Sequence, residues 1–316
     1  MSAMPLGVNL CFAVKRMPEP HAWAAFVRED LGLAHVQFTF DLLDPWWPDP
    51  ERAALIQRIT TAARSQELTI HSAYVGLAHY VPSGLLDPDP DARRLALRWW
   101  RRAIDVTAAL GASAVGGPLG TLSVADFGDP AACAERYRDL LDAVDLISRA
   151  ASSAGLQDVL IEPTPIAREF PATIDQCRRL LADLADRDAG RVGLTLDTGH
   201  AVYQPLHGPG AGVLDWVEEL GSHIRLVHLD NSDGLGDPHW GWPDPRGTFD
   251  VAGFADTVRA AGLGEVPVML EVYPRFEDDD KQVRELLISS VEHCRPHFAP
   301  AAEPSSGVGG PHVRFG

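Results

Sequence analysis

The sequence predicts an α/β protein folded as a single (β/α)8 barrel, and three observations lead to this fold class. The chain has 316 residues, which suits one large domain. Eight short apolar runs alternate with longer segments of helical periodicity. Most of these runs are continuously apolar, as expected for parallel strands buried on both faces. Eight strand–helix units match a TIM barrel, which typically takes about 250 residues plus insertions.

The predicted strands follow one another along the whole chain. They are GVNLCFAV from Gly7, HVQFTF from His35, LTIHSAYV from Leu68, SAVGGP from Ser113, DVLIEP from Asp158, RVGLTLD from Arg191, IRLVHLD from Ile224 and VPVMLEVY from Val266. A parallel order is expected because each run is followed by a segment long enough to return as a helix.

The intervening helices are predicted from apolar residues spaced three and four apart. Two such stripes are Trp23, Phe26, Val27 and Leu31, and Tyr137, Leu140, Leu141, Val144 and Ile147. Helix starts are predicted near Pro130, Pro171 and Asp250, because proline and aspartate are favoured at the first helical positions. A last helix is predicted from about Asp279 to His297.

A doubly wound open sheet is the main structural alternative. Such a sheet normally carries a glycine-rich nucleotide loop, but the chain has neither GxGxxG after its first strand nor GxxxxGK(S/T). The catalytic barrel is predicted to span residues 1–298. Residues 299–316, rich in Pro, Gly and Ser, are predicted to form a flexible tail.

Charge and cysteine content limit the class of function. The chain has 27 basic and 44 acidic residues, a net charge of −17, which opposes binding to nucleic acid. No apolar run approaches the ~18–20 residues that a membrane span needs, so no membrane association is expected. The four cysteines are widely scattered without a CxxC pair. This pattern indicates free thiols and a cytoplasmic location.

Four successive late strands end in residues that can bind a metal ion. These residues are Glu162, Asp197, His228 and Glu271. A single acidic residue at a strand end is often a helix cap or an ion-pair partner. Three carboxylates at one rim, however, would repel one another without a cation. Oxygen-rich ligands with one imidazole favour Mn²⁺, Mg²⁺ or Co²⁺, so the sequence predicts one divalent metal ion here.

The segments IEP, LDTGH, VHLDN and LEVYP that end these strands resemble the sugar phosphate isomerase/epimerase superfamily, whose fold is a xylose-isomerase-like barrel. The resemblance covers about Gly7 to Phe298. Ketose 3-epimerases of this superfamily bind one divalent metal, which implies Mn²⁺ first among the ions above, on the same four residues. The resemblance also implies that His200 binds the substrate, with capping of the following helix as the alternative.

The same resemblance implies a mechanism. Epimerisation beside a ketone removes a C–H proton and returns one to the opposite face. Glu162 and Glu271 are implied to be the two catalytic residues, alternating as base and acid on a metal-stabilised enediolate.

Further segments suggest the substrate. HWGWPD at 239–244, LDPWWP at 43–48 and HSAYVGLAHY at 71–80 are similar to erythrulose phosphate epimerases of erythritol catabolism. This similarity implies a small sugar phosphate as substrate. It also makes His71, His239 and Trp240 candidate substrate-binding residues.

Two arginines are further candidates for the substrate site. Epimerases of free ketoses carry a glutamate six residues after the first catalytic glutamate, where this chain has Arg168. An arginine there would bind a phosphate, unless it is a surface residue paired with Glu169. The family's arginine after the metal histidine is missing, because Gly234 stands there, and His239 or Arg246 is the candidate replacement.

Several other functions remain open from the sequence. An aldose–ketose isomerase or a free-ketose 3-epimerase would use the same residues, and an inosose dehydratase would begin with the same proton abstraction. A zinc-dependent apurinic endonuclease would use His71, Asp237 and His239 as well, but its fourth strand would need a histidine where this chain has glycine. A non-catalytic sugar-binding barrel is the alternative outside enzymes. A homodimer or homotetramer is also open, with Trp46 and Trp47 as a candidate interface.

Overall fold

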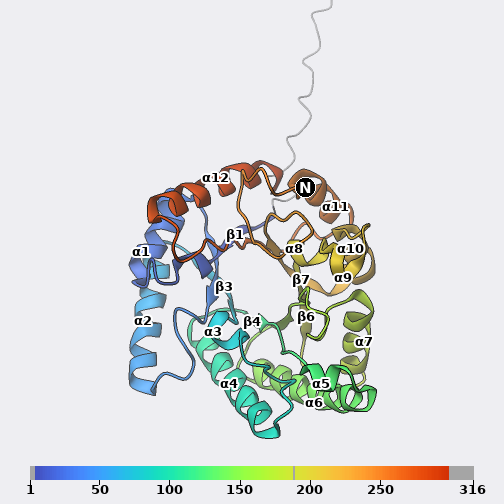
Figure 1. The fold of residues 1–316 in the computed structure, drawn as a ribbon. Helices are drawn as coiled ribbons and strands as arrows, with labels where there is room; N and C mark the ends of the chain where they lie inside the picture. The colour runs from blue at the N-terminus through green and yellow to red at the C-terminus, as the bar shows by residue number, and fades with distance from the viewer. Residues whose placement is uncertain (1–3, 188, 299–316) are drawn as a thin grey trace, which may run out of the picture.

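The computed structural model describes residues 4–187 and 189–298, and these form a closed barrel of eight parallel strands in sequential order (Figure 1). The strands are β1 Leu6–Asn9, β2 His35–Thr39, β3 Thr69–Tyr74, β4 Ala114–Gly117, β5 Asp158–Ile161, β6 Val192–Asp197, β7 Ile224–Leu229 and β8 Val268–Leu270. β1 pairs with both β2 and β8, which closes the barrel. Each predicted run overlaps one strand, and the predicted fold class is confirmed.

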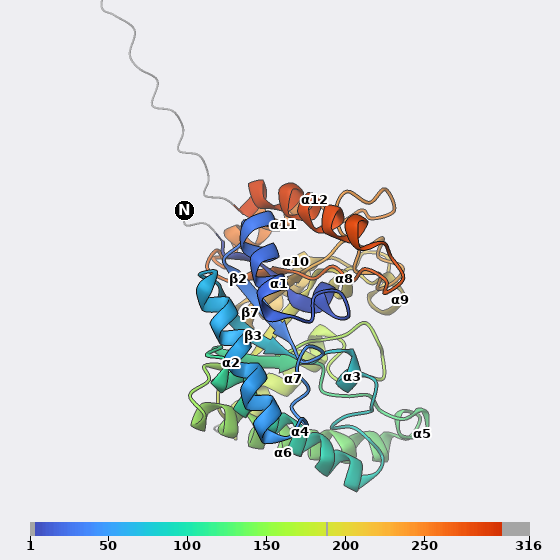
Figure 2. The ribbon, with the colours of Figure 1, turned by 90° about the vertical axis from the view of Figure 1, so that its left-hand side faces the viewer.

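Long helices surround the strands. They are α1 Pro20–Ala25, α2 Asp49–Ser65, α4 Pro90–Ala109, α6 Pro130–Ser153, α7 Ile174–Ala185, α10 Val213–Leu220, α11 Val251–Ala260 and α12 Asp280–Phe298. Shorter helices are α3 Leu77–Tyr80, α5 Val124–Phe127, α8 Thr198–Ala201 and α9 Gln204–His207. Figure 2 shows α3, α5 and α9 at the end of the barrel opposite the N-terminus. Within the described residues, no helix is long and apolar enough to cross a membrane.

Helix starts follow the expected chemistry with one exception. Pro130 is the first residue of α6, and the Asp250 side chain accepts a hydrogen bond from a backbone N–H of α11. The start predicted near Pro171 is wrong, because α7 begins at Ile174. There the Thr173 side chain accepts a hydrogen bond from the Gln176 N–H and acts as the cap.

The core has two layers. The larger layer lies between the strands and the surrounding helices and includes Trp99 and Trp100 of α4, both buried. The smaller layer fills the barrel interior with one side chain each from β3, β4, β5, β7 and β8, namely Tyr74, Ala114, Leu160, Leu226 and Met269. Burial of a large apolar side chain typically contributes about 1.5–3 kcal/mol, so the two layers together hold the strand ends in fixed positions.

Two predictions about the ends and surface of the molecule stay untested. The flexible tail at 299–316 lies outside the described residues. Trp46 and Trp47 are 39% and 42% exposed before α2, so they stay the candidate contact for the predicted homodimer or homotetramer.

Candidate active site

Four residues meet inside the barrel at the carboxyl ends of β5 to β8. Asp197 ends β6 and lies beside His228 of β7 in the strand register. Glu162 and Glu271 directly follow β5 and β8. All four are at most 7% exposed. The sequence predicts that these four residues meet at one rim of the barrel, and the structure places them together there.

The distances within this cluster suit a metal ion. His228 Nδ1 lies 2.8 Å from Glu162 Oε1, 2.8 Å from Glu271 Oε2 and 3.9 Å from Asp197 Oδ2. One donor atom from each of the four residues lies within 4.8 Å of the others. Asp197 Oδ1 accepts a hydrogen bond from the His200 N–H, while the buried Oδ2 has no partner. A buried carboxylate oxygen without a partner is costly, and a divalent cation would satisfy it.

The orientation of His228 supports the same interpretation. Its Nε2 lies 2.7 Å from the Gln37 side-chain oxygen, which also accepts a hydrogen bond from Asn9 Nδ2, while Gln37 Nε2 donates to Ser72. Since Gln37 uses its amide N–H toward Ser72, its oxygen is an acceptor and His228 Nε2 carries the hydrogen. Nδ1 is therefore the atom aimed at the carboxylates, as in a metal-binding histidine oriented from behind.

The charges of this cluster favour a positive charge at its centre. Burial lowers the pKa of His228, but the carboxylates of Glu271 and Glu162 outweigh burial and raise that pKa to about 10. Burial raises the pKa of Glu271, and His228 outweighs burial and lowers it. Without a metal, a proton on His228 neutralises part of the carboxylate charge. The donor set and its charge therefore fit one divalent ion.

A cavity of about 270 Å³ opens above these residues. Its wall includes Leu77, Tyr80, Thr164, His200, Asp237, His239 and Tyr273, together with the two glutamates. Within the part of the chain that the structure describes, no lysine or arginine lines this cavity. Tyr80 and Tyr273 lie in segments that the sequence analysis singled out, whereas nothing in the sequence pointed to Thr164.

An aspartate between two histidines forms one side of the cavity. Asp237 Oδ2 lies 3.4 Å from His200 Nε2, and its Oδ1 lies 3.1 Å from His239 Nε2. His200 Nδ1 donates to the Pro163 carbonyl at 2.9 Å. Burial lowers the pKa of both histidines, but neighbouring aspartates outweigh the effect of burial and hold each pKa well above its ordinary value. The main aspartate is Asp197 for His200 and Asp237 for His239. These imidazoles are the basic groups that face the cavity.

Asp230, which the sequence analysis did not select, supports the start of α8. Its fully buried carboxylate accepts hydrogen bonds from the Thr198 hydroxyl and the Gly199 N–H. A side chain at Gly199 would place its Cβ 2.4 Å from Asp230 Oδ2, so only glycine fits. Burial and the charge of Asp197 raise the pKa of Asp230 to about 7. Asp230 thus fixes the segment that carries Asp197 and His200.

The structure does not bring Arg168 to the active-site cavity, where the sequence predicts a phosphate contact. Its guanidinium donates to the Leu122 carbonyl at 2.6 Å and lines a separate cavity beside α6 and α7. Glu169, the next residue, lines this separate cavity too, but its buried carboxylate points inward and accepts hydrogen bonds from the hydroxyls of Thr121 and Thr164. The alternative pairing of Arg168 with Glu169 is also not formed, since the structure gives Glu169 these two hydroxyl partners.

His71 lies away from the cavity as well. It is the third residue of β3, and its Nδ1 lies 3.2 Å from the Ser72 hydroxyl. Its neighbours, including Gln157 and Arg191, come from the amino-terminal ends of the next strands and line a hollow at the opposite mouth of the barrel. Because His71 precedes the carboxyl end of its strand, the structure does not bring it to the active-site cavity, where the sequence predicts a substrate contact.

Trp240 and Arg246 pack against each other instead of lining the cavity. The Arg246 guanidinium lies 4.2 Å from the centre of the Trp240 ring and also binds Asp244. The Trp240 backbone pairs with Asn231 in both directions. Of the two candidate replacements for the missing arginine, only His239 lines the cavity.

A closed eight-stranded barrel with a buried cluster of three carboxylates and one imidazole at its carboxyl rim defines a barrel enzyme with a candidate metal centre. Residues 27–290 match the xylose isomerase-like TIM barrel family, and the chain belongs to this family.

Two relatives match nearly the whole chain. D-erythrulose 1-phosphate 3-epimerase of Brucella abortus (strain 2308) is 26% identical over 314 residues, which are 95% of this chain and 98% of that protein. A crystal structure from Rhodospirillum rubrum ATCC 11170, assigned as a candidate xylose isomerase, is 38% identical, with a TM-score of 0.89 over 93% of this chain and 99% of that chain. These relatives place the chain among the isomerases and epimerases of this fold.

The fold extends to more distant structures. D-psicose 3-epimerase of Clostridium cellulolyticum H10 is 15% identical, with a TM-score of 0.73 over 94% of this chain and 100% of that chain. At this identity the likeness concerns the barrel itself.

Proposed function

We propose that the protein is a metal-dependent 3-epimerase of a small ketose phosphate, such as a tetrulose phosphate. The observation that carries this proposal is the placement of two glutamates from non-adjacent strands beside the same imidazole. Glu162 follows β5, Glu271 follows β8, and each carboxylate lies 2.8 Å from His228 Nδ1. Both also line the cavity above the cluster. Two carboxylates in this relation can reach a bound sugar from different sides.

The reaction needs one residue that removes the C3 proton and one that delivers a proton to the other face. In the proposed mechanism Glu162 and Glu271 exchange these roles with the direction of the reaction. Asn9 Nδ2 donates to Glu271 Oε1 at 2.7 Å, which leaves Oε2 directed at the centre of the site. A divalent ion, Mn²⁺ first and otherwise Mg²⁺ or Co²⁺, would stabilise the negative charge that develops on the sugar oxygens.

The cavity suits a small substrate. Its volume of about 270 Å³ is at the lower end of ligand sites, which suits a sugar of a few carbons. The erythrulose phosphate epimerase relative supports a four-carbon phosphate. An apurinic endonuclease is disfavoured because His71 lies at the opposite mouth of the barrel and the net charge is −17.

The phosphate contact is proposed for His200 and His239, which are the basic side chains on the cavity wall among the described residues. Asp237 lies between their Nε2 atoms, so a bound phosphate would take the place of this carboxylate at one or both Nε2–H groups. Hydrogen bonds from imidazoles to phosphate oxygens are charge-assisted and therefore stronger than neutral ones.

Two related functions are favoured by specific observations. The cavity lacks a lysine or arginine within the described residues, which favours an epimerase of free ketoses. The identity of 38% to a candidate xylose isomerase favours an aldose–ketose isomerase. Both would use the same cluster of residues.

Isotope labelling separates these reactions. With a tetrulose phosphate in D₂O and Mn²⁺, we expect deuterium at C3 together with inversion of that carbon. An isomerase would place deuterium at C1 or C2 and form an aldose. The same assay with the free tetrulose shows whether the phosphate matters. Exchange at C1 or C2 with aldose formation, or no turnover of either sugar, would overturn the proposal.

A further inference from the structure

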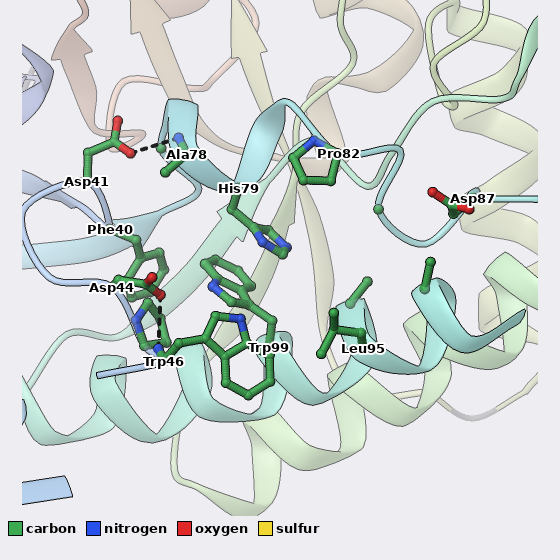
Figure 3. Close-up of a pocket in the computed structure, with 15 residues that line it drawn as sticks. Phe40, Asp41, Asp44, Trp46, Ala78, His79, Pro82, Asp87, Leu95 and Trp99 are labelled. Carbon is green, nitrogen blue, oxygen red and sulfur yellow. Dashed lines mark hydrogen bonds between the residues drawn. The ribbon is translucent and has the colours of Figure 1, made fainter. Parts of the chain in front are cut away.

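The connection from β3 into α3 is a thin wall between the active-site cavity and a second pocket. Gly76 lines both spaces. Leu77 and Tyr80 face the active-site cavity, whereas Ala78 and His79 face the second pocket, of about 240 Å³ (Figure 3). The position of this single helical turn therefore decides the width of the active-site cavity on this side.

Asp41, just after β2, holds this wall in place. Its Oδ2 accepts a hydrogen bond from the Leu77 N–H at 2.8 Å. Its Oδ1 accepts one from the Ala78 N–H at 3.0 Å, which Figure 3 shows. The first N–H groups of a helix have no partner within the helix, and Gly76 at the cap position offers no side chain. A helix of four residues is not stable alone, so it depends on such outside contacts.

Two further contacts show how closely α3 is held. A Cβ at Gly76 would lie 2.4 Å from Asp41 Cγ, although the φ of Gly76, −98°, is open to any residue. The proximity of the carboxylate, not the backbone conformation, therefore requires glycine. On the outer side, the His79 ring stacks on Trp99 of α4 with ring centres 3.6 Å apart.

We propose that Asp41 is a positioning residue that fixes α3 and, through Leu77 and Tyr80, sets the size of the sugar that the active site accepts. Asp41 does not line the active-site cavity, so its contact with the substrate site runs through the turn that it holds. The kinetic consequence rests on the proposed epimerase function. The structural consequence, a rigid turn at Leu77 and Ala78, is independent of that function.

The test compares Asp41→Ala with Asp44→Ala. Asp44 lies in the same loop and lines the same outer pocket, but its carboxylate accepts a hydrogen bond from the Trp46 N–H and none from a backbone N–H of α3, which it reaches only through its charge beside His79. For the tetrulose phosphate, we expect Asp41→Ala to raise KM about 5- to 20-fold with kcat and metal content nearly unchanged. We expect a larger relative activity on six-carbon ketoses. Asp44→Ala should match the wild type.

A double-mutant cycle separates positioning from general destabilisation. Gly76→Ala should raise KM like Asp41→Ala, because the new Cβ displaces the carboxylate. In the Asp41→Ala background, where the carboxylate is gone, Gly76→Ala should raise KM little further. An unchanged KM in Asp41→Ala, equal effects of Asp41→Ala and Asp44→Ala, or additive effects in the cycle would overturn the proposal.

Amide hydrogen exchange gives a readout without turnover. We expect faster exchange at Leu77 and Ala78 in Asp41→Ala and wild-type exchange in Asp44→Ala. If Asp41→Ala does not fold, Asp41→Asn, which keeps one acceptor oxygen, serves with the same expected direction. A wild type that epimerises no ketose would contradict the proposed function, and exchange would still decide the role of Asp41. Unchanged amide exchange at both Leu77 and Ala78 in Asp41→Ala would overturn the proposed positioning role of Asp41.

Discussion

The floor and the walls of the active-site cavity are built differently. The floor consists of side chains at the ends of β5 to β8, all of them buried and in contact across strands that pair in a fixed register. The walls come from connecting segments such as α3 and the loop that carries Asp237 and His239. In the floor, strand pairing dictates which side chains meet. In the walls, a few local hydrogen bonds decide which side chains face the substrate.

This difference separates residues that perform chemistry from residues that select the substrate. A substitution in the floor should affect turnover for every sugar, because the proton transfers and the metal site lie there. A substitution in the walls should affect one substrate more than another.

Replacement of a floor glutamate should have the largest effect. Glu162→Gln and Glu271→Gln each remove a proposed proton-transfer group, so we expect kcat to fall by about 10²- to 10⁴-fold for all ketoses that the enzyme turns over. Metal content is measured in parallel, since both residues are also candidate ligands. Near-wild-type epimerisation by either metal-loaded variant would exclude the two-glutamate mechanism.

Metal affinity should depend strongly on pH. In the metal-free protein the carboxylates raise the pKa of His228 to about 10, above its ordinary value of 6.5, so at neutral pH the metal must displace a proton. The apparent Kd for Mn²⁺ should therefore fall about tenfold for each unit of pH increase between about pH 7 and 9. Titration of the metal at several pH values measures this slope.

The same shift has a consequence for stability without metal. A raised pKa means that protonated His228 stabilises the metal-free fold fully below about pH 6.5 and that this contribution is lost as pH rises through about 10. The metal-loaded protein should not lose stability over this range. A metal affinity that is constant from about pH 7 to 9 would show that His228 carries no proton to displace.

Replacement in the wall should have a smaller, substrate-dependent effect. His239→Gln is expected to lower kcat/KM for the ketose phosphate by about 10- to 150-fold, the range for one charge-assisted hydrogen bond. The effect on the free ketose should be much smaller. Arg168→Ala is the matched control, because Arg168 contacts the Leu122 carbonyl outside the cavity. In this variant, any change in kcat/KM should be the same for the ketose phosphate and the free ketose. A selective loss in Arg168→Ala instead would assign the phosphate to that arginine.

The sequence predicted the floor and the fold because both depend on regular spacing. Continuous apolar runs indicated the parallel strands, and the residue that ends each strand could then be placed at one rim. The predicted strand order and the meeting of Asp197 with His228 follow from strand register alone.

The walls were not predictable in the same way. In the segment after β5, two threonine hydroxyls bind the Glu169 carboxylate and turn it inward. Arg168, the preceding residue, therefore faces outward. Asp41 and Gln37 act through partners on other strands or loops. Spacing along the chain carries no signal for such contacts.

The most direct test of the division between floor and walls is a crystal soaked with Mn²⁺ and a tetrulose phosphate. We expect one ion bound by Glu162, Asp197, His228 Nδ1 and Glu271, located by its anomalous scattering. We expect the sugar between the two glutamates and its phosphate beside His200 and His239. An ion held by other residues, or a phosphate bound at Arg168, would contradict this account of the site.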